Sequence, residues 1–131
     1  MIALDTNIVV RLLVNDDARQ VDKAKKTLQQ LEKKEDTAFI SDLVLLEAIW
    51  VLESGYNAKR KEIITAIEHL TTVPVFAFQD VDLVHQFVQE AEEHPIDLSD
   101  ILIGLKARLA DCETTLTFDK KAAKHPLFTK I

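Results

Sequence analysis

Four carboxylates in this chain of 131 residues lie where acidic side chains could act together in one site. Asp5 and Asp119 each follow a short apolar or threonine-rich run that predicts a β-strand. Glu47 interrupts an otherwise apolar helix, and Asp100 stands at the start of another helix. In an open α/β sheet the ends of strands and the starts of helices meet along one edge, so these side chains could converge in one crevice.

Four carboxylates in one crevice favour a bound divalent cation, because like charges at close range cannot all stay ionised without compensation. The single cysteine, Cys112, has no partner at a zinc-binding spacing, so the pattern indicates Mg²⁺ or Mn²⁺ with oxygen ligands. Such a site suits hydrolysis of a phosphodiester bond, because the metal lowers the pKa of a bound water and orients the phosphate. Three hydroxyl residues lie beside the acids and either bind a water or phosphate oxygen or cap helices: Thr6, Ser41 and Thr117.

The spacing of apolar residues predicts strands that alternate with helices along the whole chain. Strands are expected near residues 1–4, 37–40, 73–78 and 114–118, and helices near residues 8–13, 17–34, 43–52, 58–70, 81–93 and 97–105. This alternation favours a single α/β domain over residues 1–131, with a central, mostly parallel sheet of four to five strands and helices on both faces. The first strand is expected to lie centrally, whereas Pro74 favours an edge position for the third.

The helix around Glu47 carries apolar side chains on every side. A helix of this kind is buried in the domain or covered by a partner. An unpaired charge is costly in such surroundings, so Glu47 is expected to be protonated, ion-paired or bound to a metal. The alternative is that Glu47 faces solvent on a half-buried helix.

Asp97 and Asp100 stand three residues apart at the predicted start of one helix. Asp97 suits the N-cap, where free backbone N–H groups and the helix dipole favour an acid. Asp100 shares its helix face with Gly104, which would let this helix lie close to the sheet. Neither His85 nor His94 has a partner at a metal-ligand spacing, so both are interpreted as surface or capping residues.

The formal net charge of −6 argues against nucleic-acid binding driven by electrostatics alone. If a cation neutralises the acids, the Lys and Arg clusters at residues 59–61 and 120–121 could still form local basic patches; otherwise they are solvated helix ends. No apolar run approaches the roughly 20 residues of a membrane span, and the first residues do not look like a signal peptide. We therefore expect a cytoplasmic protein with no membrane partner.

The acidic motifs, taken in their order along the chain, resemble those of the PIN-domain ribonucleases. The likeness is closest to the VapC toxins of bacterial type II toxin–antitoxin pairs, and it spans essentially the whole chain. The motifs are, in order, Asp5-Thr6-Asn7-Ile8, Glu47 in its apolar helix, Asp97-x-x-Asp100-Ile101-Leu102-Ile103 and Thr117-Phe118-Asp119-Lys120. A glycine is common in this family just before the last strand, where this chain has Ala110-Asp111-Cys112; the departure bears on the turn and not on the acids.

This resemblance implies a single PIN-like domain with metal-dependent endoribonuclease activity. Four acids match the residues that hold Mg²⁺ or Mn²⁺ and position the attacking water: Asp5, Glu47, Asp100 and Asp119. Accessory positions are matched by Asp97 and Thr117, with Thr6 beside the first acid. The resemblance also implies an RNA substrate, a homodimer and a VapB-like antitoxin whose tail occupies the active-site groove. The apolar surround of Trp50 is compatible with a subunit or antitoxin interface, and core packing explains it as well.

Other functions fit parts of the same pattern. A haloacid-dehalogenase-like phosphatase also has an acid after its first strand, but it needs a second acid at position 7, which is Asn7. A phosphoacceptor receiver domain needs paired acids after that strand, and they are absent. The main alternative is a PIN-like module that binds nucleic acid or protein without catalytic turnover, against which the presence of all four acids argues. The class of RNA stays open, because RNA is recognised by shape and unstacked bases.

Overall fold

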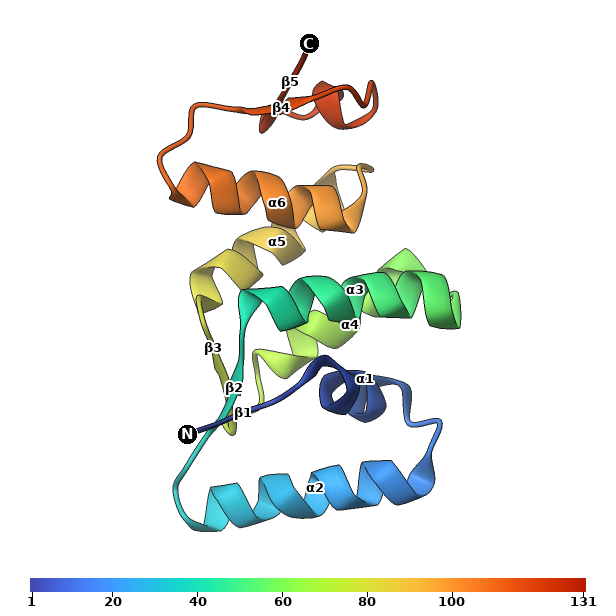
Figure 1. Ribbon diagram of the computed structural model, residues 1–131, viewed down its shortest axis with the longest axis vertical. Helices are drawn as coiled ribbons and strands as arrows, with labels where there is room; N and C mark the ends of the chain where they lie inside the picture. The colour runs from blue at the N-terminus through green and yellow to red at the C-terminus, as the bar shows by residue number, and fades with distance from the viewer. The chain divides into compact units, whose positions relative to one another are not determined.

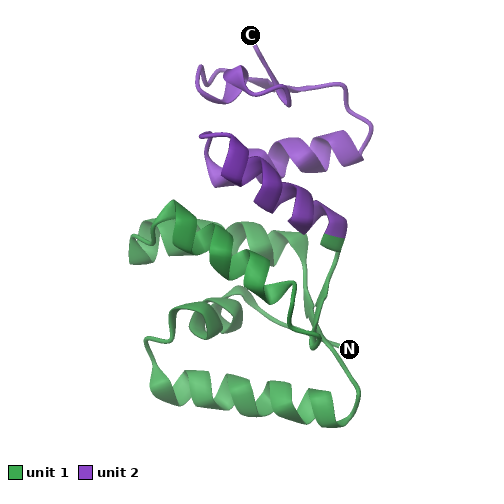
Figure 2. Ribbon diagram, turned by 180° about the vertical axis from the view of Figure 1, so that it is seen from behind, with its two compact units in different colours: residues 1–81 green, residues 82–131 purple.

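The computed structural model describes residues 1–131 and divides into two compact units, Met1–Val81 and Asp82–Ile131 (Figure 2). The helices and strands of each unit are labelled in chain order in Figure 1. No helix combines the length and the apolar character that crossing a membrane requires.

The first unit alternates strands with pairs of helices. Its elements are β1 (Ile2–Ala3), α1 (Thr6–Val14), α2 (Ala18–Lys33), β2 (Ala38–Ile40), α3 (Asp42–Tyr56), α4 (Arg60–Leu70) and β3 (Phe76–Phe78). The strands pair in parallel in the order β1-β2-β3, with Ala38 of β2 opposite both Ile2 and Phe76. Both crossovers run in the same direction across the sheet, so right-handed connections place helices α1 to α4 on one side of it (Figure 1).

Strand β2, and not β1, is central in this three-stranded sheet. Ala38 and Ile40 of β2 are buried, whereas Ile2 of β1 is 52% exposed. The expectation that the first strand is central is therefore wrong for this sheet. Strand β2 pairs on both sides, and its side chains are more deeply buried than Ile2 of β1. The expected edge position of the third strand is confirmed, since β3 pairs only with β2.

Local side-chain hydrogen bonds explain where two helices of the first unit begin. Helix α1 begins after Asp5, whose carboxylate accepts the Thr6 N–H at 2.8 Å. The acid itself is thus the N-cap, and not the neighbouring Thr6, because its side chain reaches a free N–H group of the first turn. Helix α3 begins after Ser41 as expected, and the Ser41 hydroxyl accepts the Val44 N–H at 3.2 Å.

The second unit has two helices followed by a small parallel sheet. Its elements are α5 (Val81–Glu93), which starts at the last residue of the first unit, α6 (Leu98–Leu109), β4 (Thr115–Thr117), the 3₁₀ helix η1 (Ala122–Lys124) and β5 (Phe128–Lys130). Strands β4 and β5 pair in parallel, with Thr115 opposite Phe128, and η1 lies in the connection between them.

The predicted α/β class is confirmed, because helices alternate with strands and every strand pairing is parallel. The strands form a sheet of three and a sheet of two, however, in place of one central sheet. Strand β5 escaped prediction because it has three residues and only Phe128 is buried, so no alternating pattern marks it.

Gly104 lets α6 pack closely against the segment that leads into β5, as its position on the helix predicted. A methyl group at Gly104 would lie 3.0 Å from the ring of Phe128 and 3.1 Å from the Cβ and Cδ1 atoms of Leu127. These distances are too short for any side chain larger than hydrogen without a shift of the neighbours. Because Asp100 lies one helical turn before Gly104, this close approach sets how near that acid comes to the strand pair.

Candidate active site

Asp5 and Glu47 come together within the first unit. Asp5 lies at the turn between β1 and α1, and Glu47 lies on α3, which packs against α1. Both acids line a cavity of about 210 Å³, whose wall also contains Arg11 and Tyr56. Two of the predicted site residues, far apart in sequence, therefore share one concave surface.

Glu47 is exposed, and α3 is buried on one face only. The buried side chains of α3 are Leu45, Ala48, Ile49 and Leu52. Leu43 is 78% exposed and Trp50 is 63% exposed, and both share the helix face of Glu47. Burial of α3 on every side within the domain is therefore excluded, and coverage of its exposed face by a partner stays a prediction. Glu47 itself faces solvent, and its role as a metal ligand stays a prediction.

Arg11 supplies a fixed positive charge in the same cavity. Its Nε donates to Gln20 Oε1 at 2.6 Å, and its Nη1 donates to Tyr56 OH at 2.6 Å and to Asp16 Oδ1 at 3.0 Å. The Tyr56 hydrogen bond, helped by the charge of Asp16, raises the pKa of Arg11. Sequence reasoning missed Arg11, although its position four residues after Asn7 places it on the helix face of that motif residue.

Three acids come together within the second unit. Asp97 and Asp100 lie at the start of α6, and Asp119 lies just after β4. Each offers a carboxylate oxygen, and these oxygens all lie within 4.8 Å of one another. Asp97 and Asp119 are exposed and Asp100 is half-buried. Burial raises the pKa of Asp100, and the charges of Asp97 and Asp119 raise it further.

Backbone groups fix the orientation of Asp119. Its Oδ1 accepts the N–H groups of Lys121 at 2.8 Å and Ala122 at 3.2 Å, and its own N–H donates to the Thr117 hydroxyl at 3.0 Å. These bonds occupy Oδ1 and leave Oδ2 available to a ligand. Thr117 thus positions the acid that follows it.

Asp97 occupies the N-cap position of α6, but its side chain makes no capping hydrogen bond. Asp97 therefore stands at the expected N-cap position, but its carboxylate does not accept a hydrogen bond from the helix as a capping side chain would. The carboxylate lies instead near those of Asp100 and Asp119. Thr6, the remaining accessory candidate, is buried and donates its backbone N–H to Asp5.

The PIN domain family model matches residues 2–126 of this chain. The chain belongs to the PIN domain family. It is also similar to a protein described as VapC ribonuclease from Aquifex aeolicus (strain VF5), with 20% identity over 121 residues, which are 92% of this chain and 89% of that protein. The PIN match covers both units and includes all five acids, so the resemblance read from the motifs is confirmed at the level of the family.

The acids of this PIN domain fit a hard divalent cation. The three acids of the second unit offer only oxygen ligands, and those ligands already lie within 4.8 Å of one another. Burial and the neighbouring charges of Asp97 and Asp119 raise the pKa of Asp100, and a cation beside the three acids would offset both effects. Asp5 and Glu47 form a pair in one unit, and Asp97, Asp100 and Asp119 a group in the other; one site shared by all remains a prediction.

Proposed function

We propose that residues 1–131 act as one PIN domain that hydrolyses phosphodiester bonds in RNA as a metal-dependent endoribonuclease. The observation that carries this proposal is the cluster of Asp97, Asp100 and Asp119 in a chain that matches the PIN domain family over residues 2–126. The similarity to a VapC ribonuclease supports RNA as the substrate. We further propose that the protein is the toxin of a VapBC-type toxin–antitoxin pair.

Four residues would hold the ion, Mg²⁺ or Mn²⁺: Asp5, Glu47, Asp100 and Asp119. When bound, this ion supplies charge that neutralises the phosphate and lowers the pKa of a water. Asp119 contributes by its fixed orientation, because two backbone N–H groups hold Oδ1 and leave Oδ2 for the ligand. Asp100 contributes by its half-buried place between Asp97 and Asp119, which keeps its carboxylate facing theirs. Asp97 lies close enough to hold that water by a hydrogen bond.

Arg11 would bind a phosphate of the RNA backbone beside the acids. Its Nε and Nη1 are occupied by Gln20, Asp16 and Tyr56, so the guanidinium is held rigidly and Nη2 can donate to a phosphate oxygen. Lys120 and Lys121 are exposed next to Asp119 and add positive charge at the second group of acids. These cations let an acidic protein attract RNA locally despite its net charge of −6.

The exposed face of α3 supports the proposal of a protein partner. Leu43 and Trp50 flank Glu47 on this face, and two large apolar side chains so exposed favour coverage by another chain. We propose that a VapB-like antitoxin covers this face and so blocks access to Glu47, and that the toxin itself is a homodimer. An enzyme that acts on cellular RNA and is held by such a partner would work in the cytoplasm.

The test is cleavage of a pool of structured RNAs by the purified full-length chain, with Mg²⁺ or Mn²⁺ and with a chelator. Asp5→Asn and Asp100→Asn should abolish cleavage without loss of the fold. Asp22→Asn is the matched control, because its exposed pair with Lys26 on α2 contributes little to stability. Sequencing of new RNA ends from growth-arrested cells would then identify the substrate.

Two outcomes would contradict the proposal. Cleavage that persists in the double variant of Asp5 and Asp100 would refute the site assignment. A folded wild-type chain that binds RNA but produces no new ends with either metal would instead support a PIN-like binding module without turnover.

A further inference from the structure

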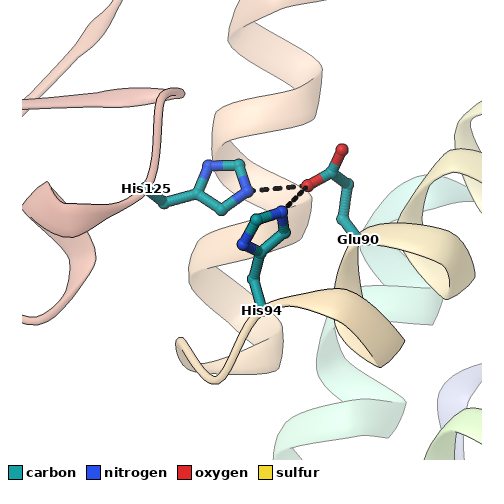
Figure 3. Close-up of side chains that lie close together, drawn as sticks. All are labelled: Glu90, His94 and His125. Carbon is teal, nitrogen blue, oxygen red and sulfur yellow. Dashed lines mark hydrogen bonds and ion pairs between the residues drawn. The ribbon is translucent and has the colours of Figure 1, made fainter.

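A second cluster of titratable side chains lies in the second unit and shares no residue with the group of Asp97, Asp100 and Asp119. Glu90 and His94 stand four residues apart on α5, and His125 follows η1. The Nε2 atom of His125 lies 2.7 Å from Oε2 of Glu90, and the Nε2 atom of His94 lies 3.4 Å from the same oxygen. The two imidazole rings meet edge to face, with centroids 4.4 Å apart (Figure 3).

This cluster borders a cavity of about 270 Å³. His125 is only 4% exposed, and Glu90 and His94 are half-buried. Glu90 and His94 both line this cavity, so water and ions in it can reach the cluster.

We propose that Glu90, His94 and His125 form a binding site for a zinc-class divalent cation. Two imidazoles and one carboxylate are the ligands of zinc sites that keep a fourth position open. Their donor atoms lie within 4.8 Å of one another, so small movements bring all three to zinc–ligand distances of about 2.0–2.2 Å. The adjoining cavity has room for a water as the fourth ligand.

The nitrogen donors distinguish this site from the group of acids. Imidazole suits zinc and its neighbours among the transition metals, whereas ligands that are all carboxylate oxygens suit Mg²⁺ or Mn²⁺. The sequence interpretation treated His94 as a surface or capping residue. It considered pairs of histidines and overlooked Glu90 at the i−4 position, and His125 lies 35 residues beyond Glu90.

In the arrangement without metal, hydrogen bonds hold the cluster together. Nδ1 of His125 accepts the Leu127 N–H at 3.1 Å, so in the neutral ring the proton is on Nε2, which donates to Glu90. Metal binding at Nε2 displaces this proton, and the ring then carries its proton on Nδ1. The Leu127 amide must turn away from Nδ1, which makes its N–H resonance a local reporter of binding.

A cation at this site would join α5 to the segment that follows η1. Asp119 lies shortly before η1, and its Oδ1 accepts the N–H of Ala122, the first residue of η1. Binding would therefore stabilise the loop that carries Asp119, because a ligand that binds only the folded chain opposes its unfolding. The inference does not depend on the proposed nuclease activity.

The test is titration of the full chain with Zn²⁺ in excess Mg²⁺, followed by equilibrium dialysis and by the melting temperature. His125→Gln and Glu90→Gln each remove one ligand, and Glu90→Gln keeps an acceptor for the His125 N–H, which protects the fold. Asp100→Asn disables the group of acids. His85→Gln is the matched control, because His85 is an exposed histidine on the same helix.

We expect one Zn²⁺ per chain, a rise in Tm on the order of 10 °C at a hundredfold excess over Kd, and a shift of the Leu127 amide resonance. Binding should persist in Asp100→Asn and His85→Gln and be lost in His125→Gln and Glu90→Gln. Zn²⁺ binding that is lost only in Asp100→Asn would belong to the acids and overturn the proposal. Unchanged affinity in Glu90→Gln, or no binding by the folded wild-type chain, would overturn it as well.

Discussion

The two glycines of this chain provide a matched test of the close packing in the second unit. Gly104 lies inside α6 against Phe128 and Leu127, with distances of 3.0–3.1 Å from a would-be Cβ. Gly55 lies near the end of α3, where the nearest atom to a would-be Cβ is Cγ1 of Val51 at 3.8 Å. The same substitution, glycine to alanine, therefore meets a crowded site in one case and an ordinary contact in the other.

The magnitudes predict opposite signs for the two variants. Alanine in place of glycine within a helix stabilises by about 0.5–1 kcal/mol, and Gly55→Ala should gain about 0.5 kcal/mol because it is near the helix end. At Gly104 the added methyl group overpacks the contact with Leu127 Cβ, an atom attached directly to the backbone, at a cost of about 1–3 kcal/mol. The cost exceeds the helix gain, so Gly104→Ala should destabilise by about 1 kcal/mol.

Urea unfolding of the full chain in a chelator measures both changes in the free energy of unfolding. Thermal unfolding gives a second measure, because each kcal/mol shifts the Tm of a chain of this size by roughly 3–5 °C. Because Gly104→Ala pushes α6 away from the strand pair, it should also lower RNA cleavage more than Gly55→Ala does. If Gly104→Ala stabilised the protein as much as Gly55→Ala, the close approach of α6 would be dispensable and the argument would fail.

Three further predictions concern single residues. Burial and nearby acids raise the pKa of Asp100, so the metal-free folded chain binds this proton more tightly than the unfolded chain, and stability falls as pH rises through the raised pKa. Asp100→Asn should remove that loss, and urea midpoints between about pH 4 and about pH 8 check it; parallel pH curves for the two proteins would contradict it. Arg11→Gln should raise KM for RNA more than it lowers kcat, with partial rescue by Arg11→Lys, and an unchanged KM would show that Arg11 does not bind the substrate. Ser41→Ala should cost about 1 kcal/mol because the Val44 N–H loses its acceptor, while Ser41→Thr should be close to neutral in the same urea assay.

Local sequence patterns predicted most of the helices and the positions of the acids. Helix α5 was expected at residues 81–93 and lies at Val81–Glu93, because its buried residues follow the helical period closely. Asp5, Ser41 and Asp119 were expected at strand-to-helix turns, and the hydrogen bonds of all three are made with neighbours in sequence. Signals of this kind depend on the nearest few residues, so they are legible without the fold.

Contacts between distant segments were decided only by the tertiary structure. The choice of β2 as the central strand depends on which strand is covered, and the exposure of Glu47 depends on which face of an apolar helix is packed. The cluster of Glu90, His94 and His125 joins residues 35 positions apart. Residue type and spacing thus determined the fold class, the family and the acids, because these follow from local chemistry. The exposed faces, the strand order and the second cluster required the fold, because packing alone decides which distant side chains meet.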